Sequence, residues 1–451
     1  MLDPKTIREN PDYVKKIIAS GRSKAEKANI DRWLELDGER HKLIQEAEVL
    51  RAERNTLSNV KGKPDPETVE RVKKLKIDLQ TLEEALSKVE TEWQTILDWV
   101  PNMPVSEESM PFGKGEEDNV ILKVWVPEKG YLDIKDKDVF DKSVMPERSV
   151  HWDDALKEPK HHLDLGQALG VIDTEQAAKV AGSRFAYITG ELAMLQYALQ
   201  RYLFDELLRR GFQPFYPPLM VRDKVLYGTS HFPEQRDQVY QIKGDYVEEG
   251  MELNLVGSAE PTNFAYFMDR PLTEEQLPWK VFAYTPCFRS EVGSWGKDVR
   301  GIKRVHQFDK LEMNVVCTPH QSEAIFAELL GINEWLWQSL DIPYQLVLKC
   351  TGDAGYHASA HQIDPEGWLP GQKEFMELGT DTNTTDFQAR RFNIKYKGAD
   401  GQKYFCHTVN DTCAAMGRAL IAIMDNYQQS DGTIKVPQVL RAYMGKDFIG
   451  K

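Results

Sequence analysis

The sequence has few cysteines, and this excludes several kinds of protein. Only five occur among 451 residues, and no two of them form a C-x-x-C pair. Scattered single cysteines indicate buried, reduced thiols rather than a disulfide framework or a zinc site. The five are Cys287, Cys317, Cys350, Cys406 and Cys413.

Long apolar runs and the familiar nucleotide-binding loops are also missing. No apolar stretch approaches the ~20 residues needed to cross a bilayer. Residues 1–5 have neither the apolar core of a secretory signal nor the acid-poor character of a transit peptide. We therefore expect a cytoplasmic protein with no membrane partner. Neither a Walker A loop nor a G-x-G-x-x-G pattern occurs, which disfavours a P-loop or Rossmann nucleotide site.

The chain has no overall excess of positive charge. Lysine and arginine total 57 against 71 acidic residues, so the formal net charge is −14. This balance argues against indiscriminate nucleic-acid binding, but RNA binding depends on local patches and not on the sum. The length allows two or three domains with at least one large core, so the distribution of charge among them matters.

The first regular pattern is a pair of apolar stripes between residues 31 and 100. The first stripe repeats every seven residues, and after a Gly/Pro break at residues 61–66 the second advances in alternating steps of three and four. This periodicity predicts two long helices that form an antiparallel coiled-coil hairpin. At 1.5 Å per residue each helix extends about 45 Å, so we expect the hairpin to project into solvent. The first stripe consists of Leu36, Leu43, Leu50 and Leu57.

The tip of this hairpin is basic although the protein is acidic. Residues 51–76 contain eight basic side chains against four acidic ones. One interpretation is an ordinary solvated coiled-coil face, and the other is an electrostatic grip on a polyanion. The basic side chains are Arg51, Arg54, Lys61, Lys63, Arg71, Lys73, Lys74 and Lys76.

The remainder of the chain has a mixed pattern. Pro101 to Pro104 ends the second helix, and a polar stretch then runs to Asn119. A helical pattern at 191–210 is followed by β-rich runs at 281–287, 305–316 and 344–350. Strands joined by short turns predict an α+β fold with a mostly antiparallel sheet flanked by helices. The expected division is a hairpin arm at 1–104, a linker at 105–119 and a catalytic domain at 120–451.

Two neighbouring segments contain an unusual row of charged and aromatic residues. Alternation places Arg289 and Glu291 on one face of a first strand, and five residues on one face of a second strand. A solvated outer face is the ordinary interpretation. As a site, the row offers cations for phosphate, a ring for a nucleobase and an acid for an ammonium group. The five residues are Arg304, His306, Phe308, Lys310 and Glu312.

These segments resemble the second signature motif of class II aminoacyl-tRNA synthetases in its seryl form. The resemblance rests on Phe-Arg-Ser-Glu at 288–291 and Arg-Val-His-Gln-Phe at 304–308. The hairpin is similar to the family's tRNA-binding arm, and the likeness covers essentially the whole chain. Further matches follow in order at 217–218 (the first motif, which shapes the dimer interface), 257–260, 350–353, 386–391, 410–418 and 436–441.

The resemblance implies a site for ATP. Arg289 would hold the α-phosphate, Arg418 the far phosphates, and Phe308 would stack on adenine. Glu377 and Thr380 would place ATP and its Mg²⁺. The implied ATP-binding set is completed by Glu291, Arg304 and Val305, and the residues implied in catalysis are Arg289, Glu312 and Arg418.

The resemblance also implies a serine pocket. A buried group that hydrogen-bonds the serine hydroxyl would reject alanine by roughly 10⁴-fold in the best comparable sites. Whether Glu312 or Thr412 reads the hydroxyl is open, and a helix starting near Thr412 is expected to add its positive end. The implied serine-binding residues are Ser258, Glu260, Arg289, Glu312, Asn410 and Thr412.

The implied activity is that of a serine–tRNA ligase. Serine and ATP would form seryl-adenylate and pyrophosphate, and serine would then pass to the 3′ end of tRNA(Ser), or of tRNA(Sec) in organisms that have one. Because the attacking carboxylate is already an anion, the enzyme must align reactants and stabilise charge without a nucleophile of its own. The partners would be tRNA, serine, ATP and a second copy of the chain.

Two other classes of protein compete with this interpretation. One is a catalytically inactive paralogue that acts as an RNA-binding or scaffolding protein. The other is a relative that loads an amino acid onto a carrier protein, and such relatives lack the arm.

The sequence departs from the family pattern at several positions. Residues 379–383 read Gly-Thr-Asp-Thr-Asn where Ser-Ser-Cys-Ser-Asn is usual, and Asp411 replaces a usual glycine. Trp295 replaces a small residue, and Ser258 replaces a threonine. Asp381 is expected to add an acid near the metal. None of these changes removes a key arginine or acid, so we expect a divergent but working enzyme.

Overall fold

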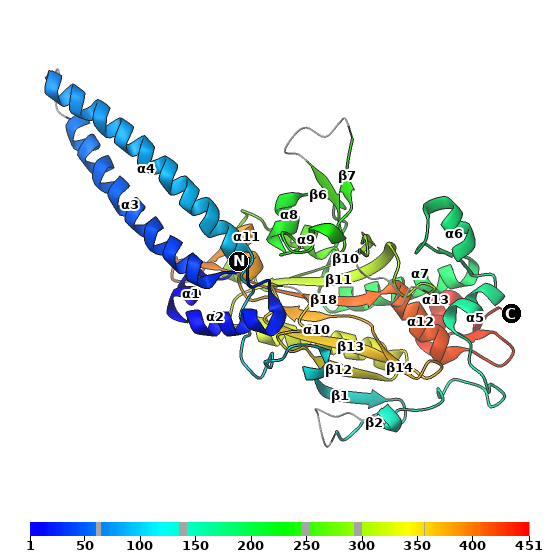
Figure 1. Ribbon diagram of the computed structural model, residues 1–451. Coiled ribbons are helices and arrows are strands. Elements are labelled where there is room, and N and C mark those ends of the chain that lie inside the picture. Colours follow the sequence, from blue (N-terminus) through cyan, green and yellow to red (C-terminus); the bar gives the residue numbers. More distant parts are fainter. Residues whose placement is uncertain (60–64, 135–141, 245–251, 293–299, 356, 451) are drawn as a thin grey trace. The chain divides into compact units, whose positions relative to one another are not determined.

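The computed structural model describes residues 1–59, 65–134, 142–244, 252–292, 300–355 and 357–450. These residues form two compact units, Met1–Met103 and Pro104–Lys451 (Figure 1). Lys61, Lys63 and Trp295, which the sequence analysis singled out, lie outside the described residues.

The first unit is helical and contains the predicted hairpin. Ion pairs between the two long helices join Arg32 to Glu92 and Arg51 to Glu83, so the later residue of one helix faces the earlier residue of the other. Figure 1 shows the two helices side by side, and the antiparallel coiled-coil prediction is confirmed. The helices of this unit are α1 (Pro4–Glu9), α2 (Pro11–Ile17), a π-helical turn (Ile18–Arg22), α3 (Ile30–Ser58) and α4 (Pro66–Asp98).

Caps and one apolar seam explain why these helices form. Asn29 and Asp65 cap α3 and α4, because each side chain accepts a hydrogen bond from a backbone N–H in the first turn. Leu36 and Leu75 on the predicted stripes are buried, whereas the residues between the stripes are mostly exposed. With 29 and 33 residues, the helices are about 44 and 50 Å long.

The second unit is built on a ten-stranded sheet with the order β2-β1-β12-β13-β15-β18-β11-β10-β5, in which β14 also pairs with β13. All pairings are antiparallel except the one between β5 and β10 at the edge, as the α+β prediction requires. Its strands are β1 (Val120–Val126), β2 (Gly130–Tyr131), β5 (Gln213–Phe215), β10 (Trp279–Phe288), β11 (Gln307–Cys317), β12 (Tyr344–Leu348), β13 (His361–Leu369), β14 (Glu374–Glu377), β15 (Asp381–Asn383) and β18 (His407–Ala415).

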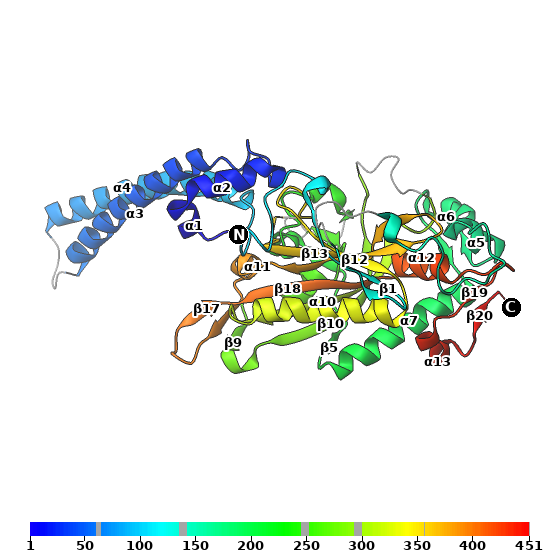
Figure 2. The same ribbon diagram turned by 90° about the horizontal axis from the view of Figure 1, so that it is seen from below.

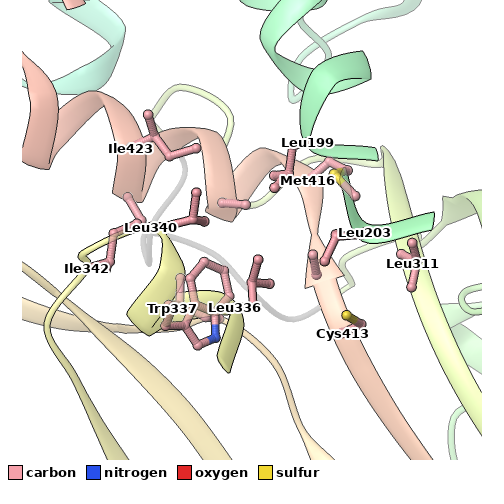
Figure 3. Packing of buried hydrophobic residues seen from close by; sticks show 14 of the residues in the cluster. Leu199, Leu203, Leu311, Leu336, Trp337, Leu340, Ile342, Cys413, Met416 and Ile423 are labelled. Atoms are coloured by element: carbon pink, nitrogen blue, oxygen red, sulfur yellow. The ribbon is translucent and has the colours of Figure 1, made fainter. Parts of the chain in front are cut away.

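Three helices bury the core of this unit against the sheet. They are α7 (Gly190–Arg209), α10 (Ser322–Ser339) and α12 (Met416–Tyr427). Figure 2 shows α10 running along the sheet, where it packs on β18, β15 and β13. Leu203 of α7, Trp337 of α10, Met416 of α12 and Leu311 of β11 belong to one buried cluster (Figure 3). Because residues alternate along β11, the core uses one face of the strand and leaves Phe308, Lys310 and Glu312 on the other.

Shorter elements surround this framework. The remaining α-helices are α5 (His162–Ala168), α6 (Thr174–Ala181), α8 (Asp223–Gly228), α9 (Glu260–Ala265), α11 (Phe387–Phe392) and α13 (Arg441–Met444). Four small sheets pair β3 (Ile172–Asp173) with β4 (Tyr187–Ile188), β8 (Leu253–Leu255) with β6 (Met220–Arg222) and β7 (Gln241–Ile242), β16 (Lys395–Lys397) with β9 (Pro271–Thr273) and β17 (Lys403–Phe405), and β19 (Ile434–Lys435) with β20 (Phe448–Ile449). Across the described ranges, no helix combines the length and apolar character needed to span a bilayer.

The stretch 105–119, expected to be a linker, makes specific contacts inside the second unit. The Gly113 N–H donates to Thr351 Oγ1 at 3.2 Å, and Asn119 Nδ2 donates to Asp353 Oδ2 at 2.8 Å. These bonds fasten the stretch to the segment that follows β12.

Candidate active site

A cleft of about 560 Å³ lies in the second unit. Every residue that the resemblance assigned to ATP, serine or metal lines it, although these residues are spread from Ser258 to Arg418 in the sequence. They come from the start of α9, the β10–β11 hairpin, β14, β18, the start of α12 and the turn before β15. They are Ser258, Glu260, Arg289, Glu291, Arg304, Val305, Phe308, Glu312, Glu377, Thr380, Asn410, Thr412 and Arg418.

The β10–β11 hairpin supplies the first wall of the cleft. Phe308 and Glu312 share the cleft face of β11, as alternation predicted. The prediction that Arg289 and Glu291 share a strand face is wrong, because β10 ends at Phe288. Glu291 instead adopts φ of 53°, and its carboxylate forms an ion pair with Arg304 that joins the two sides of the hairpin.

His306 and Arg304 likewise precede β11 and are not part of its face. The His306 ring lies against the backbone, with Nδ1 2.9 Å from the Arg289 carbonyl oxygen, and it is absent from the cleft wall. The alternation that the sequence suggested does not hold here, because the chain turns at this end of the hairpin and is not a strand.

Arg289 and Phe308 sit next to each other in the cleft. The Arg289 guanidinium carbon is 5.4 Å from the centre of the Phe308 ring, and Nε donates to the Gly257 carbonyl oxygen at 3.4 Å. A cation beside an aromatic face suits a nucleotide, which brings both phosphate and a base.

Arg418 and Glu377 are bonded to each other in the cleft. Arg418 Nη1 donates to Glu377 Oε1 at 2.7 Å and to the Glu377 carbonyl oxygen at 3.0 Å. Enclosure by the cleft walls works against ionisation, but the charge and hydrogen bond of Arg418, together with the Lys349 and Arg289 charges, outweigh it and lower the pKa of Glu377. The buried Asp364 carboxyl nearby has its pKa raised to about 7, mainly by burial and then by the Glu377 charge.

The positive end of a helix faces the cleft, but not from Thr412 as expected. Thr412 lies within β18, and its N–H donates to the Thr380 carbonyl oxygen at 2.9 Å. The helix α12 begins four residues later at Met416, and Gly417 and Arg418 of its first turn line the cleft. The N–H groups in the first turn of a helix have no partner within the helix, so this end of α12 favours an anion.

The expected serine pocket is tied together by hydrogen bonds. Glu260 Oε1 accepts from Gln388 Nε2 at 2.7 Å and from Asn410 Nδ2 at 3.2 Å. The Glu260 N–H donates to Ser258 Oγ at 3.2 Å, and Thr408 Oγ1 in turn donates to Gln388 Oε1 at 2.9 Å. These contacts hold a buried carboxylate in place, which suits an ammonium group.

Lys310 and His231 are among the cleft residues to which the resemblance assigned no role. Lys310 Nζ lies 2.6 Å from Glu312 Oε2 and donates to Thr412 Oγ1 at 3.0 Å. The sequence feature that could have pointed to a role for Lys310 was its position in the alternating row of charged and aromatic residues. His231 also lines the cleft, with Nδ1 2.9 Å from Thr229 Oγ1, and nothing in the sequence marked it. Desolvation, then the Arg289 and Lys310 charges, lower the pKa of His231 to about 3, so the ring is neutral.

The two acidic departures from the family pattern face each other. Asp381 and Asp411 are register partners on β15 and β18, and both are fully buried. Asn333 of α10 donates from Nδ2 to both Asp411 oxygens at 2.5 Å. Thr380 and Thr382 line the cleft but Asp381 does not, so the expectation that Asp381 adds an acid near the metal is wrong. Burial and the Asp411 carboxyl raise the pKa of Asp381 well above its usual range.

The basic residues of the arm fall into two groups. Arg51 and Arg71 form ion pairs with Glu83 and Glu53 across the hairpin, and Arg54 Nη2 donates to Asn55 Oδ1 at 3.4 Å. The second group consists of exposed lysines on α4 that form no ion pair within the described residues. It contains Lys73, Lys74 and Lys76.

Comparisons with known proteins agree with this geometry. Residues 1–104 match the family described as the seryl-tRNA synthetase N-terminal domain. Residues 240–427 match the tRNA synthetase class II core domain shared by the G, H, P, S and T enzymes.

Full-length relatives and solved structures extend the match over the whole chain. The serine–tRNA ligase of Dictyoglomus turgidum is 36% identical over 450 residues, which cover 99% of this chain and 98% of that protein. The seryl-tRNA synthetase of Pyrococcus horikoshii, solved in complex with ATP, has a TM-score of 0.86 and 34% identity and covers 100% of this chain and 99% of its own. The cytoplasmic serine–tRNA ligase of Naegleria fowleri, solved in complex with AMP, has a TM-score of 0.81 and 29% identity and covers 100% and 98%. The chain therefore belongs to the seryl-tRNA synthetase family of class II aminoacyl-tRNA synthetases.

Proposed function

We propose that the cleft activates serine with ATP, releasing pyrophosphate, and then transfers serine from the adenylate to the 3′ end of tRNA(Ser). The observation that carries the proposal is the convergence of the ATP, serine and metal residues on one cleft. The relatives' names and the ATP and AMP complexes of the similar structures support it. The proposed division is an arm at 1–104, a linker at 105–119 and a catalytic domain at 120–451, in a protein of the cytoplasm, where tRNA is charged for translation.

The first step needs alignment and charge stabilisation. The serine carboxylate attacks the α-phosphorus, so negative charge develops on the phosphoryl oxygens and on the departing pyrophosphate. In this proposal Arg289 binds the α-phosphate, and adenine stacks on the neighbouring Phe308. Arg418 and the first turn of α12 would bind the far phosphates. Glu260 and Asn410 hold the serine ammonium group.

Glu377 and Thr380 fit a role as ligands of Mg²⁺. Carboxylate and hydroxyl oxygens are the hard donors that Mg²⁺ prefers, and one or two protein ligands suffice where phosphates supply the others. The Arg418 charge keeps Glu377 ionised, which a ligand requires. When bound, the ion would neutralise charge on the phosphates.

Pyrophosphate exchange tests the first step. Serine should support exchange from ATP, and alanine, threonine, cysteine and glycine should not. Arg289→Ala should abolish exchange, whereas Arg32→Ala, at a partly exposed position on the arm that pairs with Glu92, should leave it unchanged. Absence of exchange with every amino acid, from folded protein with Mg²⁺, would contradict the proposal and favour the inactive RNA-binding paralogue.

The arm is proposed to bind tRNA. Exposed Lys73, Lys74 and Lys76 are available for phosphates, whereas Arg51 and Arg71 would first have to leave their acidic partners. Backbone and shape contacts dominate the recognition of structured RNA. The same contacts would serve tRNA(Sec) in organisms that have one.

A homodimer is part of the proposal. Large apolar side chains are exposed on and after α7, including Tyr197 at 59% and Tyr216 fully. Large apolar side chains that are exposed in a monomer are candidates for burial in an interface between subunits. A second cavity of about 440 Å³ lies between α6, α7 and β11 and shares Phe308 and Val305 with the active cleft. Sedimentation should give a dimer, and Tyr216→Glu should weaken it.

A further inference from the structure

We infer that Lys310 orients Glu312 and Thr412 so that the pocket recognises a hydroxyl, which makes Lys310 a specificity-determining residue of the activation step. The inference rests on the proposed function, because it concerns the same serine pocket. Its basis is a closed triangle of contacts among three side chains of β11 and β18 that all line the cleft.

The chemistry of the ammonium group sets the direction of every hydrogen bond in this triangle. Lys310 Nζ can only donate, so its contact with Thr412 Oγ1 at 3.0 Å uses a lone pair of the threonine oxygen. The Thr412 O–H must then point elsewhere, and it donates to Glu312 Oε2 at 3.1 Å. Thr412 therefore has no proton left to donate to a substrate.

Glu312 is left with one unused oxygen. Lys310 and Thr412 both contact Oε2, at 2.6 and 3.1 Å. No described residue donates a hydrogen bond to Oε1. Because an ionised carboxylate only accepts, Oε1 is an acceptor awaiting a donor. The Lys310 and Glu312 side chains are only 7% and 2% exposed, so water reaches them poorly and the ion pair is held in one arrangement.

The pocket thus presents a matched pair of groups to the amino acid. Glu312 Oε1 accepts, and the third N–H of Lys310 donates. A hydroxyl satisfies both at once, since it donates one hydrogen bond and accepts others. The methyl group of alanine leaves a buried acceptor and a buried donor without partners, which is the situation that gives strong rejection. The substrate hydroxyl is thereby assigned to Glu312, with Thr412 acting as a brace.

The first test compares serine with alanine in Lys310→Met, which keeps the length of the side chain but removes its charge and donors. In pyrophosphate exchange, kcat/KM for serine should fall by at least about 100-fold, and the preference for serine over alanine by at least about tenfold. An equal loss for both amino acids would overturn the inference, because a purely structural lysine, or a Glu312 that binds the shared α-ammonium group, would not change the ratio.

Lys349→Met is the matched control. Lys349 is also a buried lysine of the cleft, and its Nζ lies 3.5 Å from Asp364 Oδ2. Its loss should leave the serine-to-alanine ratio unchanged, and an equal drop in the ratio would overturn the inference by showing a general charge effect. Wild-type protein without serine-dependent exchange would contradict the proposed function itself, so the two failures are distinguishable.

The second test asks for a gain of activity. In 2,3-diaminopropanoate an ammonium group replaces the serine hydroxyl, and Lys310 should repel it from the wild-type pocket. In Lys310→Met the unpaired Glu312 carboxylate should accept it, so kcat/KM for this amino acid should rise at least about tenfold. The double variant Lys310→Met/Glu312→Gln should lose that gain while also showing the reduced serine preference. The double variant buries no unpaired charge, so it tests the preference even if the single variant does not fold. Equal use of diaminopropanoate by both variants would overturn the assignment to Glu312.

Discussion

Acid should destabilise the catalytic unit through one buried histidine. His162, the first residue of α5, is 2% exposed, and its Nε2 accepts the Ile302 N–H at 3.2 Å. A protonated imidazole ring has two N–H donors and no acceptor, so after protonation the His162 Nε2–H would face the Ile302 N–H without a hydrogen bond. Burial, and then the charges of His161, Arg300 and Lys303, lower the pKa of His162 from 6.5 to about 3.

The size of the effect follows from the difference between the folded and unfolded pKa values. Below pH 6.5 His162 is protonated in the unfolded chain but stays neutral in the folded protein. The stability that is present above this pH is therefore lost as the pH falls toward 3. At about pH 5 the loss amounts to about 2 kcal/mol, since each unit of separation is worth about 1.4 kcal/mol.

His162→Gln removes the titration and keeps an acceptor near the position of Nε2. Urea denaturation should show that the variant has a modest deficit near neutral pH, and that it gains about 2 kcal/mol relative to wild type at about pH 5. His162→Asn is the matched control, because its shorter amide cannot reach the Ile302 N–H. His162→Asn should be about 1 kcal/mol less stable than His162→Gln at every pH, and its stability should depend on pH as weakly as that of His162→Gln. Parallel losses of stability in wild type and His162→Gln between neutral pH and pH 5 would refute the reasoning.

Three further outcomes follow from the structure. Glu377→Gln should weaken the binding of Mg²⁺–ATP by about 10–100-fold, measured by titration calorimetry with and without the metal. If the variant and the wild type bound Mg²⁺–ATP equally well, Glu377 would not be a ligand of the metal. Replacing Lys73, Lys74 and Lys76 together by glutamate should raise KM for tRNA by at least about tenfold and flatten its salt dependence, with pyrophosphate exchange unchanged; an unchanged KM would place the RNA elsewhere. Asp381→Asn should stabilise the protein by about 1–3 kcal/mol near neutral pH. Because the pKa of Asp381 is raised in the folded protein, the wild type loses stability as the pH rises above 3.8. The gain from Asp381→Asn, measured by urea denaturation, should therefore be smaller at about pH 4 than near neutral pH. A gain of the same size at both pH values would contradict this prediction.

Local patterns carried the predictions that the structure confirms. The stripes of the arm depend on spacing along one helix, which is a property of neighbouring residues. The helix expected at 191–210 is observed at Gly190–Arg209, and the three β-rich runs became β10, β11 and β12. Alternation along β11 correctly grouped Phe308 with Glu312. Where the chain turns, the same rule failed, because Glu291 in a left-handed conformation redirects its side chain to Arg304.

The sequence by itself determined the arm, the α+β class and, through its motifs, the family and the residue types of the site. The tertiary structure alone decided how those residues are paired. The Asp381–Asp411 pair and the triangle of Lys310, Glu312 and Thr412 depend on strand register between segments up to about 100 residues apart. Register is set by the simultaneous packing of many strands and helices on one core, so no local periodicity contains it.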